Sequence, residues 1–182
     1  MSAQFLSMND VLEADARGEL DDETFDDQLW ACLISESGPL KPSEFEPAVR
    51  TYVASWIIEG DVGNGGFAQA AYNNSQWFED AAIAYEAMGL PLAGERIRKA
   101  MSLIADGAAN FTRDPGVGIG EVFAEFCESA LSDLNKGLEE IGWWAATGPR
   151  VGHVRANRDA FFRMKRYRSP PRMLWPWERR GG

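Results

Sequence analysis

Apolar residues recur three or four positions apart over most of the chain, and this spacing predicts α-helices. Nowhere do apolar and polar residues alternate as they do in a half-buried strand. The pattern predicts helices over about 10–19, 21–37, 43–60, 64–75, 77–88, 91–104, 121–138 and 152–166. We therefore predict an all-α fold, built as a single irregular or orthogonal helical bundle.

Residues with strong backbone preferences mark several helix ends. Ser43 and Glu46 have the spacing of a capping box at the start of the third helix. Asn64 is placed to cap the helix that follows it, and Gly89 occupies the usual glycine position after a helix end. Gly137 is expected to break the helix over 121–138.

The stretch 59–75 organises the rest of the chain. It is rich in glycine and then in small apolar residues, so neighbouring helices can approach it closely. Gln69 and Asn73 are four positions apart, which brings their amides to one side of a short helix. We interpret the stretch as a junction that packs two longer helices together, with amides that satisfy its own backbone groups.

A short motif lies within this junction. Its residues are Glu59, Val62, Asn64, Gly65, Gly66, Phe67, Gln69 and Asn73. The motif Asn-Gly-Gly-Phe-x-Gln resembles the signature of a bacterial DNA-mimic protein family, most of whose members have no assigned role. The similarity extends over about 26–163, because Val154 to Asn157 and Phe161 resemble the closing helix of that family. The resemblance implies a non-enzymatic protein that presents a DNA-like negative surface to a DNA-binding regulator.

Length and composition favour one folded domain with extensions. The chain has 182 residues, of which 45% are hydrophobic, enough to bury one sizeable core. We expect an acidic helical segment at 1–24, an all-α domain at 25–166 that is similar to the DNA mimics, and a basic tail at 167–182. Prolines in the tail disfavour regular structure, so we expect it to be flexible.

Charge is distributed unevenly along the chain. The formal net charge is −10, yet residues 150–182 hold ten of the 18 basic residues and only two of the 28 acidic ones. Eight basic and 26 acidic residues remain before position 150, so that part stands near −18. Such a body repels nucleic acid and attracts basic proteins, so we expect no direct DNA binding by it.

Acidic residues cluster in two stretches that form a candidate interaction surface. Its members are Asp10, Glu13, Asp15, Glu19, Asp21, Asp22, Glu23, Asp26, Asp27, Glu121, Glu125 and Glu128. Carboxylates three or four positions apart on a helix stand about 6 Å from each other, which suits the imitation of neighbouring phosphates. The expected partner is a basic protein, with a DNA-binding regulator as the class that the resemblance implies. The alternative is that the acidity only keeps the protein soluble.

Residues that carry enzyme chemistry are scarce. His153 is the only histidine, and its spacing from Cys32 and Cys127 suggests no dyad, so we expect no catalytic residue. We also predict no metal site and no cofactor, because the glutamates at 121–128 lack accompanying histidines. The two cysteines favour buried thiols in a reducing compartment, and no apolar run is long enough to span a membrane. We expect a cytoplasmic protein and leave its oligomeric state open, a dimer included.

Two other functions remain as alternatives. The amides of Gln69 and Asn73 at the Asn64–Asn73 junction are suited to line a pocket for a small ligand or a substrate. The tail, rich in arginine and tryptophan, is suited to contact nucleic acid or a membrane surface.

Overall fold

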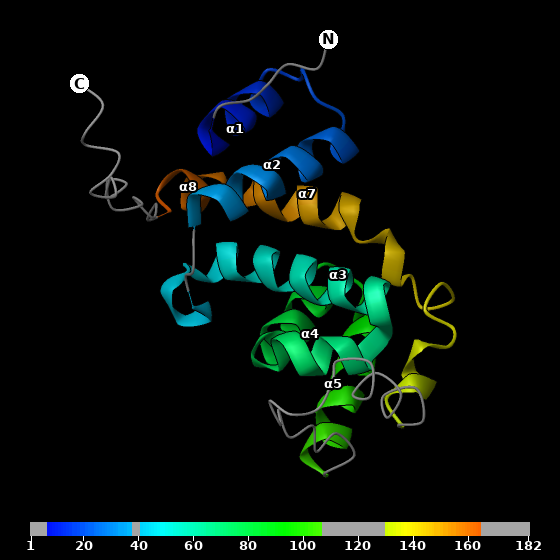
Figure 1. Cartoon of the computed structure of the whole chain (residues 1–182). Helices are drawn as coiled ribbons and strands as arrows, with labels where there is room; N and C mark the ends of the chain where they lie inside the picture. Colours follow the sequence, from blue (N-terminus) through cyan, green and yellow to red (C-terminus); the bar gives the residue numbers. More distant parts are fainter. Residues whose placement is uncertain (1–6, 38–40, 107–129, 165–182) are drawn as a thin grey trace, which may run out of the picture.

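The computed structural model of the protein describes residues 7–37, 41–106 and 130–164. Within these ranges the chain is predominantly helical and contains no strand, which confirms the predicted all-α fold (Figure 1). The tail at 167–182, the thiol of Cys127 and the candidate carboxylates of Glu121, Glu125 and Glu128 lie outside the described residues.

The first two helices begin at capping side chains. Helix α1 (Met8–Ala16) starts after Ser7, whose hydroxyl accepts a hydrogen bond from the backbone N–H of Asp10. Helix α2 (Asp22–Ser37) starts after Asp21, whose Oδ1 accepts from the N–H of Thr24 at 2.7 Å. Both helices therefore occupy positions close to those predicted, although α1 begins and ends a little earlier.

The expected capping box at Ser43 and Glu46 is wrong. A short 3₁₀ turn, η1 (Pro42–Glu44), precedes helix α3 (Pro47–Asn74), and the carboxylate of Glu44 accepts from the N–H of Lys41 at 2.8 Å. Proline at the first position of α3 needs no hydrogen-bond partner for its nitrogen, which suits a helix start.

The sequence predicted that this helix ends near Gly60, but helix α3 continues to Asn74 with a sharp kink. The backbone leaves helical geometry at Gly65 and at Gly66, where φ is +75°. The boundary between the two predicted helices therefore lies within one bent helix, at the glycine pair Gly65–Gly66.

The rest of the described chain consists of shorter elements. They are η2 (Ser75–Trp77), α4 (Phe78–Ala87), α5 (Pro91–Ala105), η3 (Ser132–Asn135), η4 (Trp143–Ala145), α7 (Thr147–Ala156) and α8 (Arg158–Phe162). Gly89 follows α4 with φ of +78°, as its predicted role requires. The helix predicted over 152–166 is instead two helices, α7 and α8. The helix predicted over 121–138 has only turns and 3₁₀ structure in its described part, 130–138.

Helix α3 lies in the middle of the molecule and contacts most of the other elements (Figure 1). Helices α2, α7 and α8 lie along one side of it, with α1 beyond α2, and helices α4 and α5 lie along the other. One apolar core runs through these layers, from Met8 and Leu12 on α1 to Phe161 on α8 and Trp143 in η4. This arrangement brings α7, a late helix, between α2 and α3.

Candidate functional site

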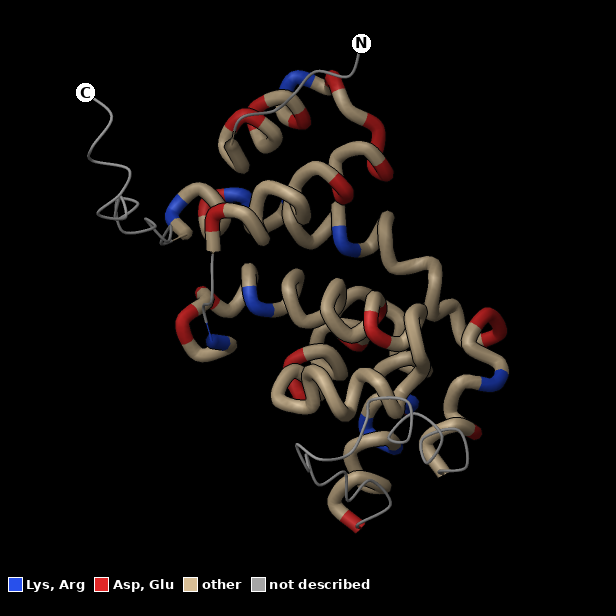
Figure 2. Tube along the Cα trace, viewed as in Figure 1, with Lys and Arg blue, Asp and Glu red and all other residues tan. Residues whose placement is uncertain are grey.

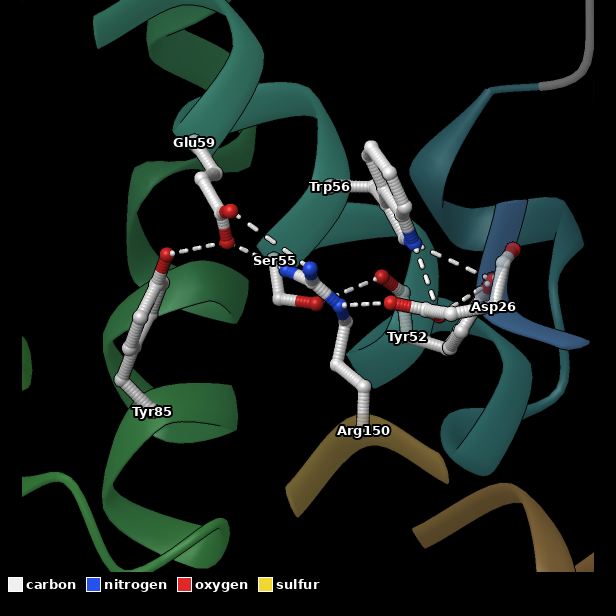
Figure 3. Close-up of polar contacts among 7 residues, drawn as sticks. All are labelled: Asp26, Tyr52, Ser55, Trp56, Glu59, Tyr85 and Arg150. Carbon is white, nitrogen blue, oxygen red and sulfur yellow. Dashed lines mark hydrogen bonds and ion pairs between the residues drawn. The ribbon is translucent and has the colours of Figure 1, made fainter. Parts of the chain in front are cut away.

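A buried arginine connects the two sides of the molecule. Arg150 on α7 has a side chain that is only 1% exposed, and it points between α2 and α3 (Figure 3). Its Nε donates to Asp26 Oδ2 at 3.0 Å, and its Nη1 donates to the carboxylate of Glu59, the first residue of the motif noted in the sequence. A guanidinium placed between two carboxylates satisfies most of its donors without water.

Aromatic side chains complete this network (Figure 3). The hydroxyl of Tyr52 lies 2.9 Å from Asp26 Oδ1, and the hydroxyl of Tyr85 on α4 donates to Glu59 Oε2 at 3.1 Å. The indole N–H of Trp56 donates to Asp26 Oδ1 at 3.1 Å, while the guanidinium carbon of Arg150 lies 4.4 Å from the ring centroid of Trp56. The network thus ties together α2, α3, α4 and α7.

The surroundings of these groups shift their pKa values. Burial raises the pKa of Tyr52 and of Tyr85, and the neighbouring carboxylates of Asp26 and Glu59 raise both further. Burial alone would lower the pKa of Arg150, but the two carboxylates outweigh it and leave that pKa above its ordinary value. The arginine is therefore charged and both phenols are neutral at ordinary pH.

We expect the protein to lose stability as the pH rises above about 10, the ordinary pKa of tyrosine. Because the pKa of Tyr85 is raised by folding, the stability that it contributes is complete below the pKa of the unfolded chain and is lost as the pH rises through the folded value. Urea unfolding across alkaline pH, compared between the wild type and Tyr85→Phe, measures this loss. A pH dependence unchanged by the substitution would contradict the prediction.

A second ion cluster holds α1 against the C-terminal helices. The carboxylate of Asp15, with a side chain 1% exposed, accepts from Arg155 Nη2 at 2.7 Å and also pairs with Arg158. Arg155 pairs with Asp22 at 2.9 Å as well. Part of the basic excess near the C-terminus therefore pairs with two acidic residues of the N-terminal helices, Asp15 and Asp22.

The structure corrects the candidate acidic surface at two positions. Asp15 and Asp26 are buried and bound by arginines, so neither is available to a partner. The exposed carboxylates of this part, here called the α1–α2 acidic surface, are Asp10, Glu13, Glu19, Asp21, Asp22, Glu23 and Asp27. Figure 2 shows acidic positions along α1, its connection to α2 and the start of α2.

Some of these exposed carboxylates are already paired. Arg17 contacts Glu19 at 2.6 Å and Glu13 at 4.0 Å, and Asp22 pairs with Arg155. Within the described part of the chain, no lysine or arginine forms an ion pair with the four others, Asp10, Asp21, Glu23 and Asp27. Among the described residues, no cation compensates the negative charge of these four through an ion pair.

The kink in α3 is fixed by a distant side chain. The N–H of Phe67, the first residue after the kink, donates to Asn135 Oδ1 in η3 at 2.9 Å. This contact supplies the cap that we had expected from Asn64. A Cβ on Gly66 would meet the amide of Asn135 at 2.2 Å, and one on Gly65 would meet Gln69 Oε1 at 2.2 Å, so both glycines leave room for these amides.

The amides of the motif act within this junction. Gln69 packs its side chain over Gly65, and Asn73 donates to Asp61 Oδ1 at 3.1 Å. Asn74 donates to the other oxygen of Asp61 at 2.8 Å, so one carboxylate before the kink is held by two amides after it. These contacts agree with a structural role for the amides and give no support to a ligand pocket built from them.

The described residues contain no group of three or more His, Cys, Asp or Glu side chains arranged to hold a metal ion. His153 lies with Nε2 2.9 Å from the carbonyl oxygen of Ala48, in a structural contact. Burial and the nearby carboxylates raise the pKa of Cys32, which favours the unreactive thiol. In the same ranges, no helix has the length and apolar character that crossing a membrane requires.

Comparison with known families matches residues 43–148 to the DMP19-like proteins, a DNA-mimic protein family. No curated protein and no solved structure matches the chain. The matched span contains Glu59 and the kink in α3, but it leaves out Asp26, Arg150 and the whole α1–α2 acidic surface. The similarity expected at Val154–Asn157 lies outside this span.

Proposed function

The chain belongs to the DMP19-like family, and from this membership we propose a non-enzymatic interaction protein that binds the basic face of a DNA-binding protein. The observation that carries the proposal is the α1–α2 acidic surface, with its four exposed carboxylates that form no ion pair with a lysine or arginine in the described part of the chain. The family supplies the class of partner, and the surface supplies the means of attracting it.

The charge on this surface suits the proposed partner. Duplex DNA presents about one negative charge per 1.7 Å of its axis, and a protein that binds it carries a matching set of lysines and arginines. Exposed carboxylates attract such a face over roughly 10 Å at about 0.1 M salt, and added salt weakens the attraction. Binding is therefore expected to be steeply dependent on salt.

The fold holds this surface in a defined position. Asp15, on the buried side of α1, is bound by Arg155 and Arg158, so α1 is fixed to the C-terminal helices by ion pairs as well as by its apolar residues. A surface whose helices are held in place before binding loses less entropy when a partner docks. The buried carboxylate of Asp15 thus helps to hold the helix that carries the exposed carboxylates Asp10 and Glu13.

We expect Asp10→Lys/Glu23→Lys/Asp27→Lys to weaken partner binding at least tenfold, because these exposed residues form no ion pair with a described residue. The immobilised protein is incubated with a lysate of its source organism at low salt, and bound proteins are then displaced with duplex DNA. The wild type should release proteins that bind DNA on their own, and the triple variant should retain little of them.

A matched control places the same charge change elsewhere. Glu79→Lys/Glu95→Lys/Asp106→Lys alters three exposed acidic residues of α4, of α5 and of its end, and should change retention less than twofold. The proposal fails if the wild type retains no DNA-binding protein at low salt, or if the control loses binding as fully as the α1–α2 variant.

A further inference from the structure

A hollow of about 380 Å³ lies beside the kink of α3. Its lining residues are Asn135, Gly137, Leu138, Glu139, Glu140 and Trp144. Trp144 is 45% exposed although it is a large aromatic residue, and its ring lies against Gly63, where a Cβ would be 3.5 Å from the ring. The indole thus rests on α3 at Gly63 with much of its surface open to solvent.

The two carboxylates of the hollow have no cation in the described part of the chain. Glu139 and Glu140 are exposed, and no described lysine or arginine pairs with either. The nearby Lys136 forms an ion pair with Asp133 instead, with 2.6 Å between Nζ and Oδ1. The hollow therefore combines an open indole with two carboxylates that form no ion pair with a described lysine or arginine.

The protein itself shows what such a combination binds. In the core, the guanidinium of Arg150 lies over the indole of Trp56 and pairs with Asp26 and Glu59. One indole and two carboxylates there hold one arginine. The hollow offers the same chemical groups at the surface.

We propose that this hollow binds one arginine side chain of a partner protein, with the guanidinium against Trp144 and its N–H groups toward Glu139 and Glu140. Arginine fits better than lysine, because its planar group stacks on an aromatic ring and donates to a carboxylate through two N–H groups. The inference rests on the proposed function only for the basic character of the partner.

The wall of the hollow is fixed before binding. Asn135 lines it and also accepts the hydrogen bond from Phe67 that holds the kink of α3. Trp144 packs against Trp143, which is completely buried, at a ring-centroid distance of 6.4 Å. Both sides of the hollow are thus connected to the core, so little reordering is needed when an arginine enters.

The test is a titration of the full chain, labelled with ¹⁵N, with the peptide acetyl-Gly-Arg-Gly-amide. The indole N–H resonance of Trp144, assigned from its disappearance in Trp144→Leu, should shift with saturable binding. The lysine peptide should bind more weakly and the neutral glutamine peptide should not bind. In Glu139→Gln/Glu140→Gln, whose Trp144 resonance can still be followed, the affinity should fall about three- to tenfold.

The matched control is Glu95→Gln/Asp106→Asn, which removes the same charge from exposed positions of α5 and its end and should change the affinity less than twofold. The inference is overturned if the glutamine peptide shifts the resonance equally, if the control weakens binding as much as the hollow variant, or if no shift occurs. Because the capture experiment depends on α1 and α2, a failure here leaves its result intact.

Discussion

Arg150→Met is expected to lower the free energy of unfolding by about 3–5 kcal/mol, because it leaves two carboxylates in the interior without their cation. Asp26 is 1% exposed and Glu59 is largely covered, so neither can be fully hydrated in place of the lost pairs. Methionine fills much of the volume of the arginine stem, so the loss reports on charge more than on a cavity. Urea unfolding followed by circular dichroism measures it.

Two further variants separate the causes. Arg163→Met removes an exposed arginine whose pair with Glu46 is 3.7 Å long, and it should cost less than about 1 kcal/mol. Adding Asp26→Asn and Glu59→Gln to Arg150→Met removes the stranded charges and should recover part of the stability. A loss below about 1 kcal/mol for Arg150→Met, or no recovery in the triple variant, would contradict the electrostatic explanation.

This network gives one residue of the Glu59–Asn73 motif a physical role. Glu59 lies within the family-matched span and faces Arg150, which lies just beyond it. Asp26, also outside the span, binds the same guanidinium. The segments on either side of the matched region therefore complete the contacts of a residue inside it, which ties the acidic α2 to the shared part of the fold.

The helices were predictable because their apolar spacing reflects burial, and the same spacing identifies the buried carboxylates. Asp15 comes four residues after Val11 and three after Leu12, both completely buried, so it continues the inward face of α1. Asp26 likewise precedes the buried Leu29 by three positions. Grouping these aspartates by charge alone placed them at the surface, whereas their position on the helix predicts burial and a need for partners.

The partners themselves were not predictable from local pattern. Arg150 is 124 residues from Asp26, and Asn135 is 68 residues from the N–H of Phe67 that it caps. Both contacts depend on which helices pack together, and no helix-end signal near Asn64 or Gly66 specifies a cap supplied from η3. The glycine pair did mark the right place, because a bend that brings the backbone against another side chain requires residues without Cβ.

Gly66→Ala is the second substitution for which we expect a large effect, a loss of about 2–4 kcal/mol in the free energy of unfolding. The backbone at Gly66 has φ of +75° and ψ of −174°, a region that costs residues with a Cβ about 1–3 kcal/mol. The added methyl would also lie 2.2 Å from the amide of Asn135, which must move and give up its hydrogen bond with Phe67.

Gly60→Ala provides the opposite expectation within the same helix. Gly60 is exposed, lies within the regular part of α3 and has no atom within 4 Å of an added Cβ, so alanine should stabilise the protein by about 0.5–1 kcal/mol. Urea unfolding of both variants, with the indole resonance of Trp144 as a local reporter of the hollow lined by Asn135, compares them directly. If both substitutions change the free energy of unfolding in the same direction, the conformation of Gly66 does not determine the kink. If Gly66→Ala lowers it, Gly60→Ala raises it and the Trp144 resonance is disturbed only in Gly66→Ala, the bend of α3 is assigned to Gly66 and its contact with Asn135.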